Sequence, residues 1–209
     1  MNNTRALICD TATKMFNEKG YHAVSLRDIA KEAGTTIGNL TYHFKKKEDL
    51  VAAMVSELQD DFSLYFSTGL TGKDLLLDIL NSFKKAEENR KRYSFYYNNL
   101  NELAAVSENL MRKNQMFQKK LYDYYLLSLR VLQGEGLVKE TVDKVSLHLL
   151  ACTLVNISGS WGTLASPYSN TLINTRSYSE TCCDMLSVFL SADYLPAVEE
   201  WKKIADVSD

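Results

Sequence analysis

The segment AGTTIGNLTYHFKKK, residues 33–47, carries the side chains of this chain that are best suited to bind a ligand. It combines hydroxyls, an amide, a phenol and an imidazole with only two aliphatic side chains between Gly34 and Phe44, and it ends in three lysines. Short polar side chains can hydrogen-bond to base edges in the major groove of DNA, while Lys, Tyr and His suit phosphate oxygens. The segment therefore suits a DNA-reading helix, although a merely solvated helical corner has the same composition.

Three predicted helices position this segment. Apolar residues recur with helical spacing over residues 4–19, which predicts a first helix that stops at Gly20. Ser25 and Asp28 have the spacing of a capping box, so a second helix begins after Ser25. Gly34 ends that helix after about nine residues.

A third helix is predicted over residues 37–43, with Thr36 as its N-cap. Two short helices joined by a glycine-containing turn form a helix-turn-helix. Leu40 and Phe44 are expected to face the core. The side chains expected to lie outward or at the edges are those of Thr35, Ile37, Asn39, Thr41 and Tyr42.

The sequence beyond Lys47 predicts helices almost to its end, without a β-hairpin pattern or an internal repeat. The predicted ranges are roughly 47–67, 72–90, 92–105, 108–134, 142–165 and 172–193. The expected fold is therefore all-α. The net charge also differs between the two parts of the chain: residues 1–50 carry +2 and the remaining residues −4, for a total of −2. This modest basic excess indicates an anionic partner for the amino-terminal part.

The run ICDTATKMFNEKGYHAVSLRDIAKEAGTTIGNLTYHFKKKEDLV, Ile8–Val51, closely resembles the TetR (tetracycline-repressor, AcrR-like) family of bacterial transcription regulators. The resemblance implies a three-helix DNA-binding domain over residues 1–46, with its helix-turn-helix at about 25–44. Residues 47–209 would then form a larger helical domain for effector binding and dimerisation, similar to the family in helix count and order only. The implied function is a sequence-specific repressor that a small molecule releases from its operator.

The resemblance also assigns DNA-binding roles to individual residues. Thr36 would cap the recognition helix, Thr35, Ile37, Gly38 and Asn39 would face the groove, and Thr41 would lie beside them. Tyr42, His43, Lys47 and Ser25 would hold phosphates. Two positions depart from the family pattern: Thr41 replaces a frequent tyrosine, and Lys46 stands where a Ser or Asn usually caps the next helix.

Two aromatic runs, RYSFYYNNL at 92–100 and LYDYYLL at 121–127, have two interpretations. They can be core packing, or they can form the wall of a pocket for an aromatic or lipophilic effector. Under the second interpretation the predicted ligand-binding residues are Tyr96, Tyr97, Asn99, Tyr125 and Trp161.

Two late helices are expected to form a four-helix interface between two copies of the chain. The residues predicted for it are Val145, Leu149, Cys152 and Asn156 on one helix and Leu172, Met185, Leu186, Phe189 and Leu190 on the other. The resulting homodimer would read a palindromic operator in double-stranded DNA, with half-sites about 34–36 Å apart.

Other functional classes have little support in the sequence. The chain has no nucleophile elbow, phosphate-binding glycine loop or metal-ligand spacing, so we expect no enzyme activity, cofactor or metal ion. The absence of a long apolar run and of signal-peptide features predicts a cytoplasmic protein without membrane contact. Cys9, Cys152, Cys182 and Cys183 are expected to be buried thiols, with a redox sensor at Cys182 and Cys183 as the alternative. The alternative function is a helical protein–protein adaptor without DNA readout.

Overall fold

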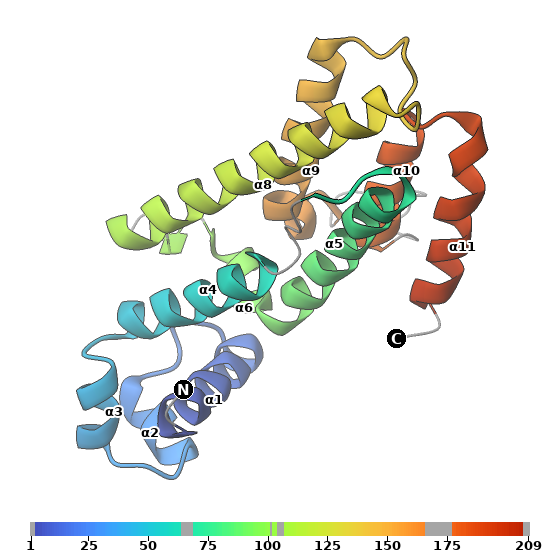
Figure 1. Cartoon of the computed structure of the whole chain (residues 1–209). Helices are drawn as coiled ribbons and strands as arrows, with labels where there is room; N and C mark the ends of the chain where they lie inside the picture. Colours follow the sequence, from blue (N-terminus) through green and yellow to red (C-terminus); the bar gives the residue numbers. More distant parts are fainter. Residues whose placement is uncertain (1–2, 64–68, 101, 104–106, 166–176, 207–209) are drawn as a thin grey trace. The chain divides into compact units, whose positions relative to one another are not determined.

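The computed structural model describes residues 3–63, 69–100, 102–103, 107–165 and 177–206. Within these ranges the chain is helical and forms no strand, apart from one isolated antiparallel bridge between Val138 and Leu190. The all-α prediction is confirmed (Figure 1). The helices are α1 Asn3–Lys19, α2 Leu26–Glu32, α3 Ile37–His43, α4 Lys47–Ser63, α5 Gly72–Arg92, α6 Ser94–Asn98, α8 Glu108–Gly134, α9 Lys144–Ala165, α10 Tyr178–Ser187 and α11 Leu195–Asp206, with a 3-10 turn at Ala192–Tyr194.

The chain divides into two compact units. The first comprises Met1–Asp61 with Asn89–Asn114, and the second comprises Phe62–Glu88 with Gln115–Asp209. The first unit has its own apolar core, in which the largest fully buried side chains are those of Ile8, Phe16, Ile29, Leu40, Leu50, Met54 and Leu103. The prediction that residues 1–46 bind DNA and residues 47–209 bind an effector and dimerise concerns activity, and the division into two compact units does not test it.

Helix α6 is shorter than the predicted helix over 92–105, and the side chain of Asn17 on α1 explains where it begins. The Asn17 side chain donates to the Arg92 carbonyl oxygen at 2.8 Å and accepts from the Phe95 N–H at 2.9 Å. It also accepts from the Ser94 hydroxyl at 2.9 Å. Because one side chain satisfies backbone groups on both sides of Tyr93, the chain can leave α5 and start α6 without unpaired polar groups.

The prediction of one helix over 172–193 is wrong for the described part of that range. Helix α10 ends at Ser187, and the following backbone pairs with residues 137–139. The Lys139 N–H donates to the Phe189 carbonyl oxygen at 3.0 Å, and the Ser191 N–H donates to the Leu137 carbonyl oxygen at 2.8 Å. These groups are then unavailable to a continuing helix. The chain turns and forms α11, which the sequence had not predicted as a separate helix.

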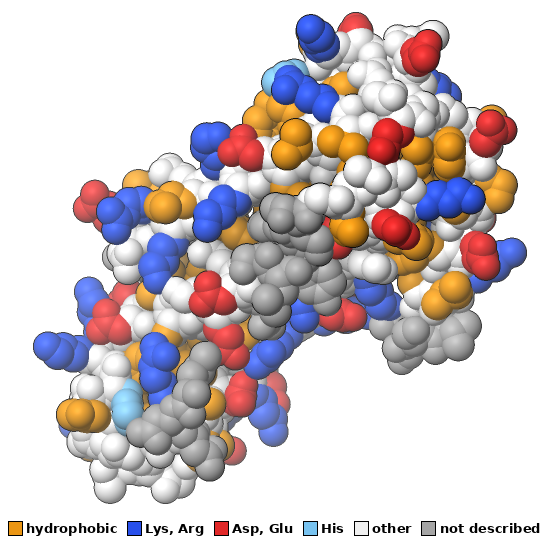
Figure 2. Space-filling view, viewed as in Figure 1, with side chains coloured by type: hydrophobic (Ala, Val, Ile, Leu, Met, Phe, Trp, Pro, Cys, Tyr) orange, Lys and Arg blue, Asp and Glu red, His pale blue; other side chains and the backbone are white. Residues whose placement is uncertain are grey.

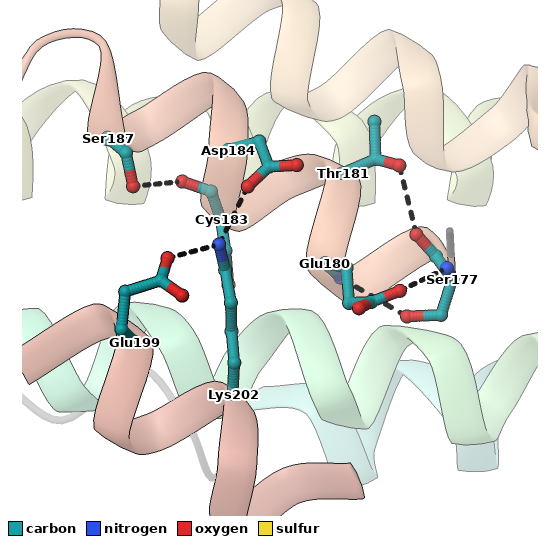
Figure 3. A network of polar contacts seen from close by, with 8 residues as sticks. All are labelled: Ser177, Glu180, Thr181, Cys183, Asp184, Ser187, Glu199 and Lys202. Atoms are coloured by element: carbon teal, nitrogen blue, oxygen red, sulfur yellow. Dashed lines mark hydrogen bonds and ion pairs between the residues drawn. The ribbon is translucent and has the colours of Figure 1, made fainter. Parts of the chain in front are cut away.

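Helix α11 is held in the second unit by polar contacts around an apolar core. The Lys202 ammonium lies 2.7 Å from Asp184 on α10 and 2.7 Å from Glu199 on its own helix (Figure 3). The Trp201 indole donates to the Asn81 side-chain oxygen on α5 at 2.9 Å. These contacts tie α11 to both α5 and α10.

The cysteine prediction is correct at three positions and wrong at one. Cys9, Cys182 and Cys183 are buried, whereas Cys152 is exposed on α9. Burial raises the pKa of the Cys9 thiol to about 11 and raises the pKa of Cys183 as well. A raised thiol pKa disfavours the reactive thiolate, so these buried cysteines are poorly suited to a redox-sensing role.

Candidate nucleic-acid interface

Local backbone chemistry sets the geometry of α2 and α3. The Ser25 hydroxyl accepts from the Asp28 N–H at 3.2 Å, and the Asp28 carboxylate accepts from the Ser25 N–H at 2.9 Å, which is the predicted capping box. Gly34 adopts φ +63°, a left-handed conformation that glycine tolerates best. The chain then turns at once, and the Thr36 hydroxyl accepts from the Asn39 N–H at 3.1 Å to cap α3.

Helix α3 has one buried and one exposed face, as predicted. Leu40 and Phe44 are buried in the core of the first unit. On the other side, Ile37 and Tyr42 are exposed, and the Tyr42 side chain has a relative exposure of 84%. Asn39 is exposed as well. The helix therefore presents a phenol, an amide and an aliphatic group to solvent in its two turns.

The polar groups on this face differ in how free they are to bind. The Asn39 amide nitrogen donates to the Thr35 hydroxyl at 2.8 Å, which holds the two side chains in a defined relative position and leaves the Asn39 side-chain oxygen available. The Thr41 hydroxyl donates to the Ile37 carbonyl oxygen at 2.9 Å. Thr41 therefore offers chiefly its methyl group, while Asn39 and Thr35 form the better hydrogen-bonding pair.

The position of Lys47 adds a structural role to the predicted phosphate contact. Its ammonium donates to the carbonyl oxygens of Tyr21 at 2.7 Å and Val24 at 2.8 Å, and it lies 4.2 Å from the centre of the Tyr21 ring. Burial lowers the pKa of the Lys47 ammonium. Two of its three N–H donors are thus committed to the backbone between α1 and α2, which leaves one for a phosphate.

Other cations around α2 and α3 are more accessible. Arg27, Lys45 and Lys46 are exposed, and none of them forms an ion pair with another described residue. Figure 2 shows Lys, Arg, Asp and Glu side chains mixed over the amino-terminal part of the surface, while the lowest part, where α2 and α3 lie, is mostly uncharged in this view. Sequence reasoning missed Arg27, although its place in the first turn of the second predicted helix was a usable signal. Lys46 does not cap α4 with its side chain; instead the Asp49 carboxylate accepts from its N–H at 3.2 Å.

The remaining predicted contacts lie beside this surface. His43 is half-buried, with its ring centre 5.2 Å from that of Tyr42. Gly38 is exposed, and a Cβ placed there would come no nearer than 3.9 Å to the Thr36 hydroxyl oxygen. The structure thus places the predicted residues of α3 and its N-cap on one exposed surface. Ser25, the N-cap of α2, is exposed as well.

Residues 8–54 match the sequence profile described as "Bacterial regulatory proteins, tetR family". Over these residues the chain is similar to that family. It is 26% identical over 140 residues to the probable HTH-type transcriptional regulator YttP of Bacillus subtilis (strain 168), a match that covers 64% of this chain and 65% of YttP. The match therefore spans less than two thirds of that relative's length.

The fold of the whole chain is also found among solved tetR-family structures. A TetR-family transcriptional regulator from Marinobacter aquaeolei VT8 superposes with a TM-score of 0.80 at 16% identity, covering 98% of this chain and 99% of that one. The structure of a SmeT–triclosan complex superposes with a TM-score of 0.63 at 21% identity, covering 90% of this chain and 92% of that one. At these identities the likeness concerns the fold.

The five residues predicted to bind an effector do not share one unit of the chain. Tyr96, Tyr97 and Asn99 belong to the first unit, and Tyr125 and Trp161 to the second. Tyr96 and Tyr125 are buried; burial raises the pKa of both phenols, and the Tyr125 hydroxyl lies 3.2 Å from that of Ser82. Their role in ligand binding stays a prediction.

A hollow of about 530 Å³ does occur in the second unit, and none of those five residues lines it. It lies between α8 and the start of α5, and its lining is Gly69, Leu70, Thr71, Leu75, Lys120, Asp123, Tyr124, Leu127, Ser128 and Val131. Its volume falls in the range of about 300–1,000 Å³ that is typical of small-molecule sites. Within the residues described, no group of three or more His, Cys, Asp and Glu side chains is placed to hold a metal ion.

The residues predicted for the dimer interface divide between surface and core. On α9, Val145 and Leu149 have relative exposures of 66% and 61%, and Cys152 and Asn156 are exposed one and two turns further on. On α10 and after it, the prediction is wrong for Leu186 and Leu190, which are fully buried in the core of the second unit.

The other residues of that second interface helix have different positions. Met185 and Phe189 are half-buried, and Leu172 lies outside the described residues. The exposed apolar residue at the end of α10 is instead Val188. Among the helices that the structure describes, none has the length and apolar character needed to cross a bilayer.

Proposed function

We propose that this protein is a dimeric, sequence-specific DNA-binding regulator that represses transcription until a small molecule releases it. The observation that carries the proposal is the exposed face of α3 and of the turn before it. There the Asn39 amide nitrogen lies 2.8 Å from the Thr35 hydroxyl oxygen, and the Tyr42 side chain is exposed. A capped helix with such groups fits the major groove, where an amide can pair with adenine and a hydroxyl with either kind of base edge. The uncommitted cations around it suit the phosphates on both sides.

A homodimer follows from the small size of this reading surface. One helix of seven residues contacts few base pairs, and a two-fold pair of such helices reads two half-sites of a palindromic operator. The α9 stripe that begins with Val145 and Leu149 supports the same proposal, because exposed apolar side chains at helical spacing are typical of a helix that packs against another helix.

Ligand control is supported by the hollow beside α8 and by the relative that has been observed with a small molecule, SmeT with triclosan. An effector acts through its different affinities for the DNA-binding conformer and for the other conformer, and it can shift the equilibrium by no more than that difference. We assign DNA reading to residues 1–46, and effector binding and dimerisation to residues 47–209. We also place the protein in the cytoplasm and assign it no enzymatic activity.

Selection of bound duplexes from a random pool tests the proposal directly. We expect a palindrome whose half-sites are separated by about one helical turn, bound with an affinity that falls steeply as salt rises. The control is the Asn39→Ala variant, which should select a sequence that is relaxed at one position in each half-site. A protein that enriches no sequence and shows no salt-dependent binding would be an adaptor and not a regulator; the relatives give that alternative no support.

A further inference from the structure

The hollow between α8 and the start of α5 has a graded lining that runs from a buried apolar floor to an exposed mouth. Leu75 and Ser128 are buried, while Leu70, Tyr124 and Val131 are half-buried. Leu127, with a relative exposure of 65%, lies at the mouth together with Lys120 and Asp123. An apolar hollow that opens beside charged side chains suits a ligand with an apolar body and one polar end.

The polar groups at the inner end are already paired. The Tyr124 hydroxyl donates to the Asp78 carboxylate on α5 and is also hydrogen-bonded to Ser128. Burial, followed by the bond to Asp78, raises the pKa of the Tyr124 phenol, so this group remains protonated. Because a charged group pushed inward would find no free partner and would lose its hydration, the apolar end of a ligand must enter first.

The charges at the mouth favour an anion. Asp123 is paired with Lys119, whose ammonium lies 2.7 and 2.9 Å from the two carboxylate oxygens. Lys119 is not part of the lining, whereas Lys120 is, and Lys120 forms no ion pair with another described residue. Asp78 lies behind Tyr124 and does not line the hollow. Among the described residues that line the hollow, Lys120 therefore carries the one charge without an ion-pair partner.

We propose that this hollow binds an amphipathic carboxylate, with its aliphatic chain against Leu70, Leu75, Leu127 and Val131 and its head group at Lys120. The claim that the hollow binds this ligand depends only on the geometry of the hollow. The claim that the ligand is the effector of the regulator also rests on the function proposed above.

Calorimetric titration of the full chain with decanoate, without DNA, tests the site. Decanol and decyltrimethylammonium are the uncharged and cationic probes of similar length. We expect decanoate to bind about fivefold more tightly than decanol, the value of one exposed charge pair, and the cation to bind most weakly. Equal binding of decanoate and decanol, or tighter binding of the cation, would overturn the proposal.

Two pairs of variants locate the ligand. Lys120→Gln should remove the advantage of decanoate over decanol, whereas Lys203→Gln, at an exposed lysine of α11 outside the lining, should keep it. Leu127→Glu should weaken decanoate binding by about tenfold or more because it replaces apolar contact with a like charge. Ile204→Glu, at a similarly exposed apolar site on α11 that does not line the hollow, should bind decanoate normally. Loss of binding in both members of a pair, or in neither, contradicts this location.

A DNA-binding measurement distinguishes ligand binding by the hollow from an effector role of the ligand. Decanoate should lower operator affinity in the wild type and in Lys203→Gln, and lower it less in Lys120→Gln. If decanoate binds with the expected dependence on Lys120 but operator affinity does not change, the effector role is wrong and the site stands. If no operator exists, the regulator proposal fails while the calorimetric result is unaffected.

Discussion

Replacing Lys47 with methionine tests whether this lysine acts mainly on the fold or on DNA. Methionine keeps most of the aliphatic stem but removes the ammonium that donates to the carbonyl oxygens of Tyr21 and Val24. A hydrogen bond from a charged donor contributes about 1.5–3 kcal/mol, and a cation over an aromatic ring contributes about 0.5–1 kcal/mol at exposed sites. Lys47 is only partly buried, so water recovers some of this loss, and we expect a net destabilisation of about 2 kcal/mol.

Amide hydrogen exchange measured by mass spectrometry reports this loss locally. Peptides that cover the chain between α1 and α2 should exchange about thirtyfold faster in Lys47→Met, the factor that corresponds to about 2 kcal/mol. The logarithmic salt slope of operator binding should change by less than about half a unit, because most of the donors of Lys47 face the protein.

Lys45→Met is the matched control. Lys45 is exposed and forms no ion pair with a described residue, so its loss should lower the salt slope by about 0.9 unit and leave exchange unchanged. A Lys47→Met variant that exchanges like the wild type and loses a full unit of salt slope would refute a mainly structural role for Lys47. Lys47 would then be a phosphate contact, and its bonds to the backbone would contribute nothing measurable.

Three further substitutions test the base contact of Asn39, the dimer interface at Leu149 and the capping box at Asp28. Asn39→Ala should cost about 1–3 kcal/mol of discrimination at one base position and leave the salt slope intact, which titrations against operator and scrambled duplexes will measure. Leu149→Glu should weaken the dimer by at least about a hundredfold, because each subunit loses an apolar contact worth about 1.5–3 kcal/mol; a wild-type mass by light scattering at micromolar concentration would contradict this. Hydrogen bonds from Ser25 lower the pKa of the Asp28 carboxyl below its ordinary value of 3.8. The wild type should therefore be more stable than Asp28→Ala above that pH and lose this advantage as pH falls through the lowered pKa, as thermal melts at decreasing pH will show.

Sequence reasoning was most successful where short-range chemistry decides the structure. The caps at Ser25 and Thr36 and the stop at Gly34 depend on hydrogen bonds and backbone angles within a few residues, so their spacing alone predicted α2 and α3. The burial of Leu40 and the exposure of Tyr42 then follow from helical periodicity.

It was least successful where a residue's partner lies far along the chain. The end of α10 depends on pairing with residues 137–139, and the position of the Lys47 ammonium depends on two carbonyl oxygens in the segment between α1 and α2. Likewise, the sequence did not show which aromatic side chains would be buried in a core and which would line a hollow, because Tyr124 and Tyr125 are neighbours that point in different directions.

The sequence by itself determined the helical class and the helix-turn-helix, because these depend on local periodicity and on capping residues at fixed spacing. Tertiary structure alone decided which polar groups remain free. A side chain binds a ligand only with donors and acceptors that the fold has not already used. At Lys47 and Tyr124 the partners come from distant parts of the chain, the backbone between α1 and α2 and the Asp78 carboxylate on α5.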